Sequence, residues 1–438
     1  MNIPGGQLAH RTATGLHRRT FLAAGGRTIL LALASSAAGL NRVIAQDKMS
    51  ASNEVEQRVA AIVEAYDAQG NHRTGTSVDN KSAEWLADEI RRSGTEPSLE
   101  SFTLSRVDPL SCYLRIADRR IEGVPMFDAA FTNEEGITGT LGALGSDADI
   151  ALVESDTFKL DEPRRQRGGT IAEARQSRHK GIIILTKGSR PGLSLLNALF
   201  FRAPSGPAML QVSSAEHEWL MTQARTGAQA TLVTHVKRTT AQAFNVIARV
   251  AGSDSGLAPL VIVAPRSGWW QCASERGGGL ACWLETIRVL AAAKPARDCL
   301  FAAFSGHELG LLGVDTYFES RPDLIKHSYA CIFLGANIGA PRQPNLIQVS
   351  DVPLEVWIAD ALQKQGLVVN QKAPPESERR GEAAIFQGGG ARYLVLACGS
   401  DVFHSAADRW PDEVDVAILA RYATSIANGV VELVRQRS

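Results

Sequence analysis

The sequence predicts an α/β protein with a mixed, mainly parallel sheet and helices on both faces. From about residue 244 onward, short apolar runs typical of buried strands alternate with longer helical runs, the pattern of a parallel sheet covered by helices. Between about residues 105 and 240, short apolar runs alternate with Gly, Pro and charged turns, which predicts a β-rich insertion. The 438 residues are 45% hydrophobic and 21% charged, so the chain can bury a core of ordinary size.

The first part of the sheet domain is expected to begin with two amphipathic helices. They lie at "NEVEQRVAAIVEAY" (53–66) and "KSAEWLADEIRRSG" (81–94), where Gly94 is a typical helix end. A loop rich in turn residues, "GNHRTGTSVDN", separates them, and "SLESFTL" (98–104) is expected to form a strand.

The second part of the sheet domain supplies the remaining elements. Strands are expected at "FNVIARVAG" (244–252), "PLVIVAP" (259–265), "DCLFAAFSG" (298–306), "YACIFLGANIG" (329–339), "PNLIQVS" (344–350) and "YLVLACGSD" (393–401). Helices are expected at "GGGLACWLETIRVLAAA" (277–293), "HELGLLGVDTYFES" (307–320) and "DEVDVAILARYATSIANGVVELVRQ" (412–436). The glycines that open the first of these helices allow another backbone to approach closely.

The N-terminus has the features of a twin-arginine export signal. Arg18 and Arg19 precede a short apolar run, and a small-residue cleavage pattern ends at Ala45. The run is shorter than the roughly 20 residues of a membrane span. We therefore expect a periplasmic or secreted protein whose mature part has no membrane span. The expected organisation is a signal peptide (1–45), a peptidase-like domain in two parts (46–104 and 241–438) and the insertion (105–240).

Composition excludes some classes of function. The formal net charge is zero, so nothing indicates a nucleic-acid partner. None of the six cysteines forms a C-x-x-C pair, which argues against a zinc ribbon. The apolar stretch "LSLLNALFF" (193–201) inside the insertion either packs in the core or forms a loop that covers a site.

Candidate site residues follow the ends of the predicted strands. Ligands of α/β proteins bind beyond the carboxyl ends of the parallel strands. The metal-capable side chains at these positions are Glu275, His307, Glu308 and His404. His307 and Glu308 do not begin an H-E-x-x-H zinc motif, because the residue four positions after His307 is Leu311.

The blocks "GNHRTGTSVDNKSAEWLADEIRRSG", "GGGLACWLETIRVL", "FAAFSGHELGLLG" and "FHSAADRWPDEVD" resemble, in this order, the secreted zinc aminopeptidases, a family that includes bacterial leucyl aminopeptidases and glutaminyl cyclases. The resemblance implies a zinc exopeptidase-like fold from about residue 50 to the end. It also implies that the insertion is similar to a protease-associated domain.

The resemblance also implies which metal ligands remain. Pro265 and Ser267 stand where the family has His-x-Asp, and the family's late Asp is absent near Gly335 and Ala336. One of the two metal sites is thereby lost. The other would be formed by Glu275, Glu308 and His404, which could hold one zinc ion with an open water position.

The remaining candidates surround this set. His307 occupies the position of the family's general base and could take a proton from water. Arg266 and Arg276 could replace the charge of the lost metal or bind an anionic substrate group, or Arg276 could pair with Glu275 and leave the site without metal. Trp269 and Trp270 are candidates for a substrate wall or for core packing.

The expected function is that of an exported hydrolase acting on amide bonds of peptides or small amides with at most one zinc ion. One alternative is a catalytically inactive homologue that binds a peptide or small ligand in the former cleft. Another is a metal-free hydrolase with Ser267 or Ser274 as nucleophile, although no G-x-S-x-G motif is present.

Overall fold

The computed structural model describes residues 53–156, 164–374, 377, 379 and 381–435. The predicted export signal lies outside these residues. The described strands are β1 (Pro97–Ile116), β2 (Arg119–Glu122), β3 (Val124–Pro125), β4 (Ile137–Ala143), β5 (Ile150–Asp156), β6 (Gly181–Lys187), β7 (Ala208–Ser213), β8 (Gln229–Val250), β9 (Leu260–Pro265), β10 (Cys299–Phe304), β11 (Ala330–Leu334), β12 (Asn345–Val349), β13 (Gln371–Lys372) and β14 (Tyr393–Cys398).

A first helix covers residues 53–67. The helices that follow are α2 (Ser77–Arg92), α3 (Arg164–Gln176), α4 (His217–Arg225), α5 (Gly278–Ala293), α6 (Leu312–Glu319), α7 (Leu324–His327), α8 (Val352–Gln363), α9 (Glu382–Gly388) and α10 (Val416–Arg435). Helix α2 begins earlier than predicted, because the Thr76 side chain accepts a hydrogen bond from the Asp79 amide and caps it.

The centre of the sheet is parallel, as predicted. Strands run in the order β12-β14-β11-β9-β10-β8, and the β14-β11, β11-β9 and β9-β10 pairs are parallel, whereas β12 and β8 are antiparallel to their neighbours. Because successive side chains of a strand point to opposite faces, each strand contributes to two cores.

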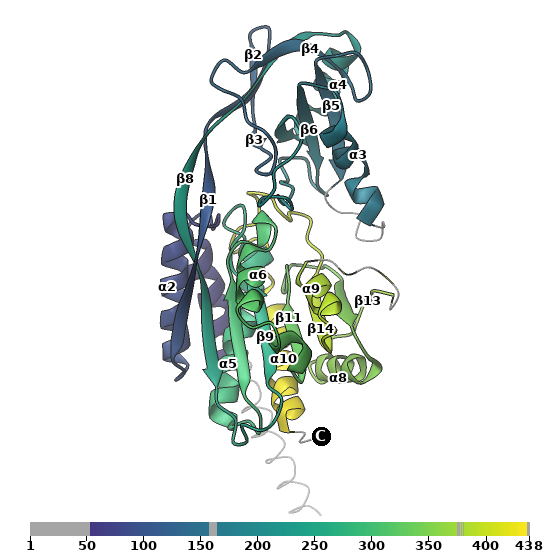
Figure 1. Cartoon of the computed structure of the whole chain (residues 1–438). Coiled ribbons are helices and arrows are strands. Elements are labelled where there is room, and N and C mark those ends of the chain that lie inside the picture. The colour runs from purple at the N-terminus through teal and green to yellow at the C-terminus, as the bar shows by residue number, and fades with distance from the viewer. Residues whose placement is uncertain (1–52, 157–163, 375–376, 378, 380, 436–438) are drawn as a thin grey trace, which may run out of the picture. The chain divides into compact units, whose positions relative to one another are not determined.

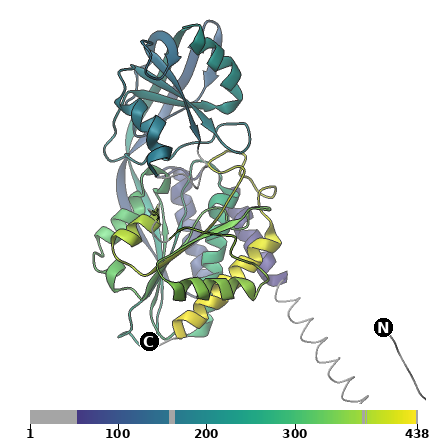
Figure 2. The same ribbon diagram turned by 90° about the vertical axis from the view of Figure 1, so that its right-hand side faces the viewer.

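Helices cover both faces of this sheet (Figure 1). On one face, Leu260, Ile262 and Ala264 of β9 pack in a core that includes the first helix, α2, α5, α8 and α10. On the other face, Val261 and Val263 pack with α6 and α9. Helix α8 lies beside the C-terminal helix α10, drawn in yellow in Figure 2.

Two long antiparallel strands connect the sheet to the inserted residues. β1 and β8 are paired from Pro97↔Ala248 to Ile116↔Ala230, and Figure 1 shows them as adjacent twisted ribbons. Both run through the predicted boundaries of the insertion at residues 105 and 240, so the sheet is continuous there. The residues between them form β4 to β7 with α3 and α4, around separate apolar clusters. The likeness of this region to a protease-associated domain stays a prediction.

The predicted helix at 307–320 is wrong at its start. His307–Leu309 form a separate 3₁₀ turn, and α6 begins only at Leu312. The reason is the backbone at Gly306, Gly310 and Leu311, where positive φ values of 89°, 76° and 69° cannot belong to a right-handed helix. The turn therefore holds His307 and Glu308 outside the regular helix.

Among the described residues, α10 is the one helix that is long and apolar enough to cross a membrane by length and composition. Of the most apolar 18-residue stretch of this helix, 61% is buried inside the protein. Its residues Leu419, Tyr422, Ile426 and Val430 belong to the core on the face of the sheet that α5 also covers.

Candidate functional site

The site is formed by segments that leave the carboxyl ends of β9, β10 and β14. β9 ends at Pro265 and is followed by Ser267, β10 leads into the turn with His307 and Glu308, and His404 follows β14. The parallel arrangement of these strands brings all three segments to one edge of the sheet.

Glu275 and Arg276 lie in a π-helical turn, Ala273–Gly277, directly before α5. Both side chains are only 1% exposed, and Arg276 Nη2 lies 2.7 Å from Glu275 Oε1, an ion pair without the angle of a hydrogen bond. Asp408 caps the turn by accepting hydrogen bonds from the amides of Ser274 and Glu275. Asp408 therefore braces the turn that holds Glu275. Burial raises its pKa to about 7.

The charges of this turn depend on each other. Burial would raise the pKa of Glu275, but the positive charge of Arg276 and the other groups around the carboxylate together outweigh burial, and the pKa is lowered. Burial would lower the pKa of Arg276, but the negative charge of Glu275 and the other groups around the guanidinium together outweigh burial, and the pKa is raised. Glu275 is therefore an anion and Arg276 a cation at neutral pH.

His404 is buried and held in one tautomer. Its Nδ1 donates to the Leu195 carbonyl over 2.6 Å, so Nε2 is left as an acceptor, 3.3 Å from Glu275 Oε1. Burial lowers the pKa of His404, which keeps the ring neutral. The backbone of His404 has a φ of 56°, in the left-handed region that residues other than glycine seldom adopt.

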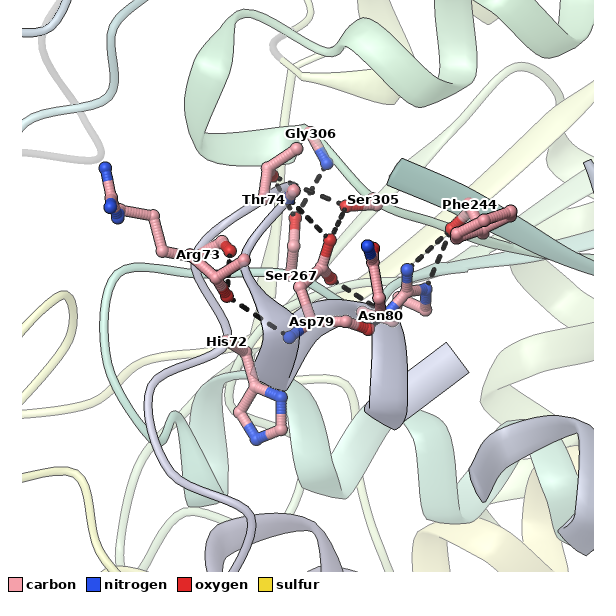
Figure 3. A network of polar contacts seen from close by, with 12 residues as sticks. His72, Arg73, Thr74, Asp79, Asn80, Phe244, Ser267, Ser305 and Gly306 are labelled. Atoms are coloured by element: carbon pink, nitrogen blue, oxygen red, sulfur yellow. Dashed lines mark hydrogen bonds and ion pairs between the residues drawn. The ribbon is translucent and has the colours of Figure 1, made fainter. Parts of the chain in front are cut away.

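Glu308 is buried in a hydrogen-bond network with the loop before α2, part of which Figure 3 shows. Its Oε1 accepts from the amide of Thr74 at 2.8 Å and from its hydroxyl at 2.6 Å. Its Oε2 accepts from the hydroxyl of Ser267 at 2.7 Å, which in turn accepts from the amide of Gly306. Thr74 was not singled out from the sequence, although it lies in a block that carries the resemblance.

The structure corrects the predicted substrate contacts of three residues. Arg266 is fully buried, pairs with Asp79 at 2.9 Å and donates to the carbonyl of Phe244, so it belongs to the internal network. Trp269 is 3% exposed and stacks on Phe127. Arg276 is buried in its ion pair.

Trp270 was a candidate for a substrate wall or for core packing, and Ser267 and Ser274 were candidate nucleophiles. Trp270 is partly buried and donates a hydrogen bond to the His404 carbonyl, so it supports the His404 segment. Ser267 and Ser274 are both fully buried, which removes them as nucleophiles for a substrate in solution.

The apolar stretch at residues 193–201, the covering loop, both packs in a core and covers the site. Leu195 donates its amide to the His404 carbonyl and holds the His404 ring, and Ala198 donates to the carbonyl of Glu308. Leu195 and Ala198 are buried, while Leu199 and Phe200 are more than half exposed. The insertion therefore contributes directly to the site.

His307 forms a second pair with a residue that the sequence reasoning missed. Its Nδ1 lies 2.8 Å from Oε1 of Glu382, the first residue of α9. Burial would raise the pKa of Glu382, but the contacts with His307 and the other groups around the carboxylate together outweigh burial, and the pKa is lowered. The carboxylate thus accepts from Nδ1, and Nε2 of His307 is left as a base. The His307 side chain is 14% exposed, more than the side chains of Glu275, Arg276 and His404.

Zinc, which the resemblance implies, does not fit the residues present. Glu275 and His404 lie together, but both oxygens of Glu308 are already hydrogen-bonded, and the guanidinium of Arg276 stands against Glu275. Across the described part of the chain, no three His, Cys, Asp or Glu side chains are placed to hold one metal ion. The predicted set of Glu275, Glu308 and His404 is therefore not assembled as a metal site.

Comparisons with known proteins agree with this fold. Residues 245–429 match peptidase family M28. None of the curated protein sequences compared with the chain matches it significantly.

Solved structures of aminopeptidases are similar over most of their length. A zinc aminopeptidase from Bacillus subtilis is 19% identical, with a TM-score of 0.70 over 88% of this chain and 95% of that one. The aminopeptidase from Aneurinibacillus sp. strain AM-1 is 17% identical, with a TM-score of 0.66 over 87% and 94%. A peptidase M28 precursor from Shewanella amazonensis SB2B is 16% identical, with a TM-score of 0.68 over 89% and 97%. Residues 245–429 therefore resemble peptidase family M28, and the chain has the fold of these aminopeptidases.

Proposed function

We propose that the protein is an exported hydrolase that cleaves amide bonds in peptides or small amides, with His307 as its general base. The observation that carries this proposal is the pair of His307 and Glu382. A buried carboxylate orients the ring and fixes the proton on Nδ1, which directs the basic Nε2 away from Glu382. Export by the twin-arginine route is part of the proposal and rests on the sequence alone.

In the proposed reaction, His307 Nε2 takes a proton from a water molecule as the water oxygen attacks the amide carbonyl carbon. The carbon–nitrogen bond then breaks, and the same proton passes from His307 to the departing amine. No step requires the buried carboxylates to move.

The test is a screen of aminoacyl and N-acyl amides with the wild type and the variants His307→Gln and Glu382→Gln. We expect His307→Gln to lower kcat/KM by about 10²-fold or more, the usual contribution of a general base. Glu382→Gln is expected to lower it by about tenfold or more, because an amide no longer fixes the tautomer. His327→Gln, a change at an exposed histidine of α7, is the matched control and should leave kcat/KM unchanged.

A second candidate is an inactive homologue that binds a peptide or small ligand in the former cleft. It is favoured by the internal pairing of Glu275 with Arg276, which satisfies charges that a metallopeptidase would use on its metal. Calorimetric titration with short peptides separates the candidates. Peptide binding that persists in His307→Gln, together with no turnover by any protein in the screen, would favour the binding function and reject the proposed hydrolysis.

A further inference from the structure

Arg276 is buried against Glu275, one of the groups that the resemblance assigns to metal binding. Its side chain is 1% exposed, its Nη2 lies 2.7 Å from Glu275 Oε1, and its Nε donates to the Ser267 carbonyl at 2.7 Å. The carbonyl of Ser267 follows directly after β9, so the guanidinium is anchored to the edge of the sheet from which the site is built.

The electrostatic surroundings of Arg276 are those of a bound cation. Two carboxylates of the predicted metal set, Glu275 and Glu308, both act on its charge. A buried carboxylate without a compensating cation is costly, and here the guanidinium supplies that cation from the neighbouring position in the chain. His404 completes the surroundings with a neutral ring whose Nε2 faces Glu275.

We propose that Arg276 is a built-in cation that takes the place of a metal ion in this site and excludes zinc from it. The inference does not depend on whether the site hydrolyses a substrate. A guanidinium resembles a metal ion only in charge, because it cannot be deprotonated in proteins and has no exchangeable water ligand. Any chemistry at the site must then obtain its base from a side chain, and His307 is placed for that role.

The experiment compares zinc binding by the wild type and by Arg276→Asn, each purified without chelators. Zinc content is measured by elemental analysis, zinc affinity by calorimetric titration, and Tm with and without zinc or EDTA. Arg297→Met is the matched control, because Arg297 is also a buried arginine but donates to the Ala258 carbonyl.

We expect the wild type and Arg297→Met to bind no zinc and to keep the same Tm in zinc and in EDTA. Arg276→Asn leaves Glu275 without its cation, so it should bind one zinc ion per chain and gain about 5 °C or more in Tm at saturating zinc. If this variant does not fold alone, refolding in zinc should restore its fold. Changing Glu275 to Gln as well should abolish the gain.

Two results would overturn the inference. One is wild-type protein that binds a stoichiometric zinc ion lost in Glu275→Gln, since Arg276 would then not exclude the metal. The other is an Arg276→Asn protein that neither binds zinc nor refolds in its presence, since the guanidinium would then not occupy a metal position.

Discussion

Two buried histidines near the site have rings that are hydrogen-bonded to backbone carbonyl oxygens. His404 donates to the Leu195 carbonyl, and His72 lies 2.9 Å from the Tyr66 carbonyl while its ring stacks on the Tyr66 ring at 3.7 Å. Burial lowers the pKa of His72 from 6.5 to about 3, although its hydrogen bond opposes the shift. Protonation of His72 is therefore linked to unfolding.

His72→Phe is expected to change how stability depends on pH. Between pH 6.5 and about 3, the unfolded wild type binds a proton at His72 that the folded protein does not bind. The free energy of unfolding of the wild type, relative to the variant, should therefore fall as the pH falls, by about 1.4 kcal/mol per pH unit below 6.5. Urea unfolding of both proteins at pH 7 and pH 5 measures this difference. A difference that stays constant between the two pH values would contradict it.

At the scale of single residues, the sequence predicted which side chains belong to the site better than it predicted which residues they contact. Glu275, Glu308 and His404 were found because each follows the end of a predicted strand, and Glu308 and His404 also lie in blocks of the resemblance. The pairing of Arg276 with Glu275 was among the stated alternatives, because the two residues are adjacent. Glu382 was missed, because it contacts His307 from a helix 75 residues later and no local pattern links the two.

The start of α5 shows how one element depends on close backbone approach. A Cβ added to Gly278 would lie 1.8 Å from the Ile338 carbonyl oxygen, far inside van der Waals contact. The run of three glycines at the start of α5 was expected to allow such a close approach. It allows the segment after β11 to pack against the helix that follows Glu275 and Arg276.

Gly278→Ala is expected to lower the free energy of unfolding by about 3 kcal/mol or more, because the segment at Ile338 must move. Gly388→Ala in α9 is the matched control. It has open space around its Cβ and should be neutral or stabilising by about 0.5–1 kcal/mol. Denaturant unfolding of both variants measures the two changes. Equal effects would contradict the role of close packing at Gly278.

At the scale of elements, the strands were predicted more reliably than the turns between them. Buried strands β9, β10, β11 and β14 appear as uninterrupted apolar runs, which sequence reading detects. The turn at His307–Leu309 was predicted as helix, because its residues share the apolar spacing of α6. Its left-handed flanks at Gly310 and Leu311 depend on tertiary packing that spacing does not reveal.

The first helix and the segment after β14 are joined across almost the whole described chain. Asp67 accepts from Nε and Nη2 of Arg409 at 2.9 and 3.0 Å, and from the amide of Trp410. The Asp67 side chain is 7% exposed. Through Arg409, the segment after His404 is therefore tied to the first helix.

Asp67→Asn should lower the free energy of unfolding by about 1–2 kcal/mol, because it breaks a bidentate charged contact of which one partner is half exposed. Glu54→Gln, which loses only a long, exposed ion pair with Arg58, is the control and should change it by less than about 0.5 kcal/mol. Thermal unfolding of both proteins provides the measurement. An Asp67→Asn protein as stable as the control would refute the bracing role.

The sequence predicted the layered α/β architecture, because periodic apolar patterns extend over most of the chain. It could not predict that the covering loop would reach His404 and Glu308. That contact depends on how the insertion is carried by β1 and β8, which the local pattern at 193–201 does not encode. The sequence left open whether residues 193–201 pack in the core or cover the site, and the structure shows that they do both.

The unbroken β1–β8 ladder also limits how this insertion can diverge among relatives. A one-residue insertion or deletion in either strand would turn every later side chain to the opposite face. The irregularity between Pro109 and Ser111 is where the ladder already absorbs a change of register. Length variation should therefore be concentrated at this irregularity and in the loops beyond the ladder, and relatives that lack the insertion should have lost both halves of the ribbon together.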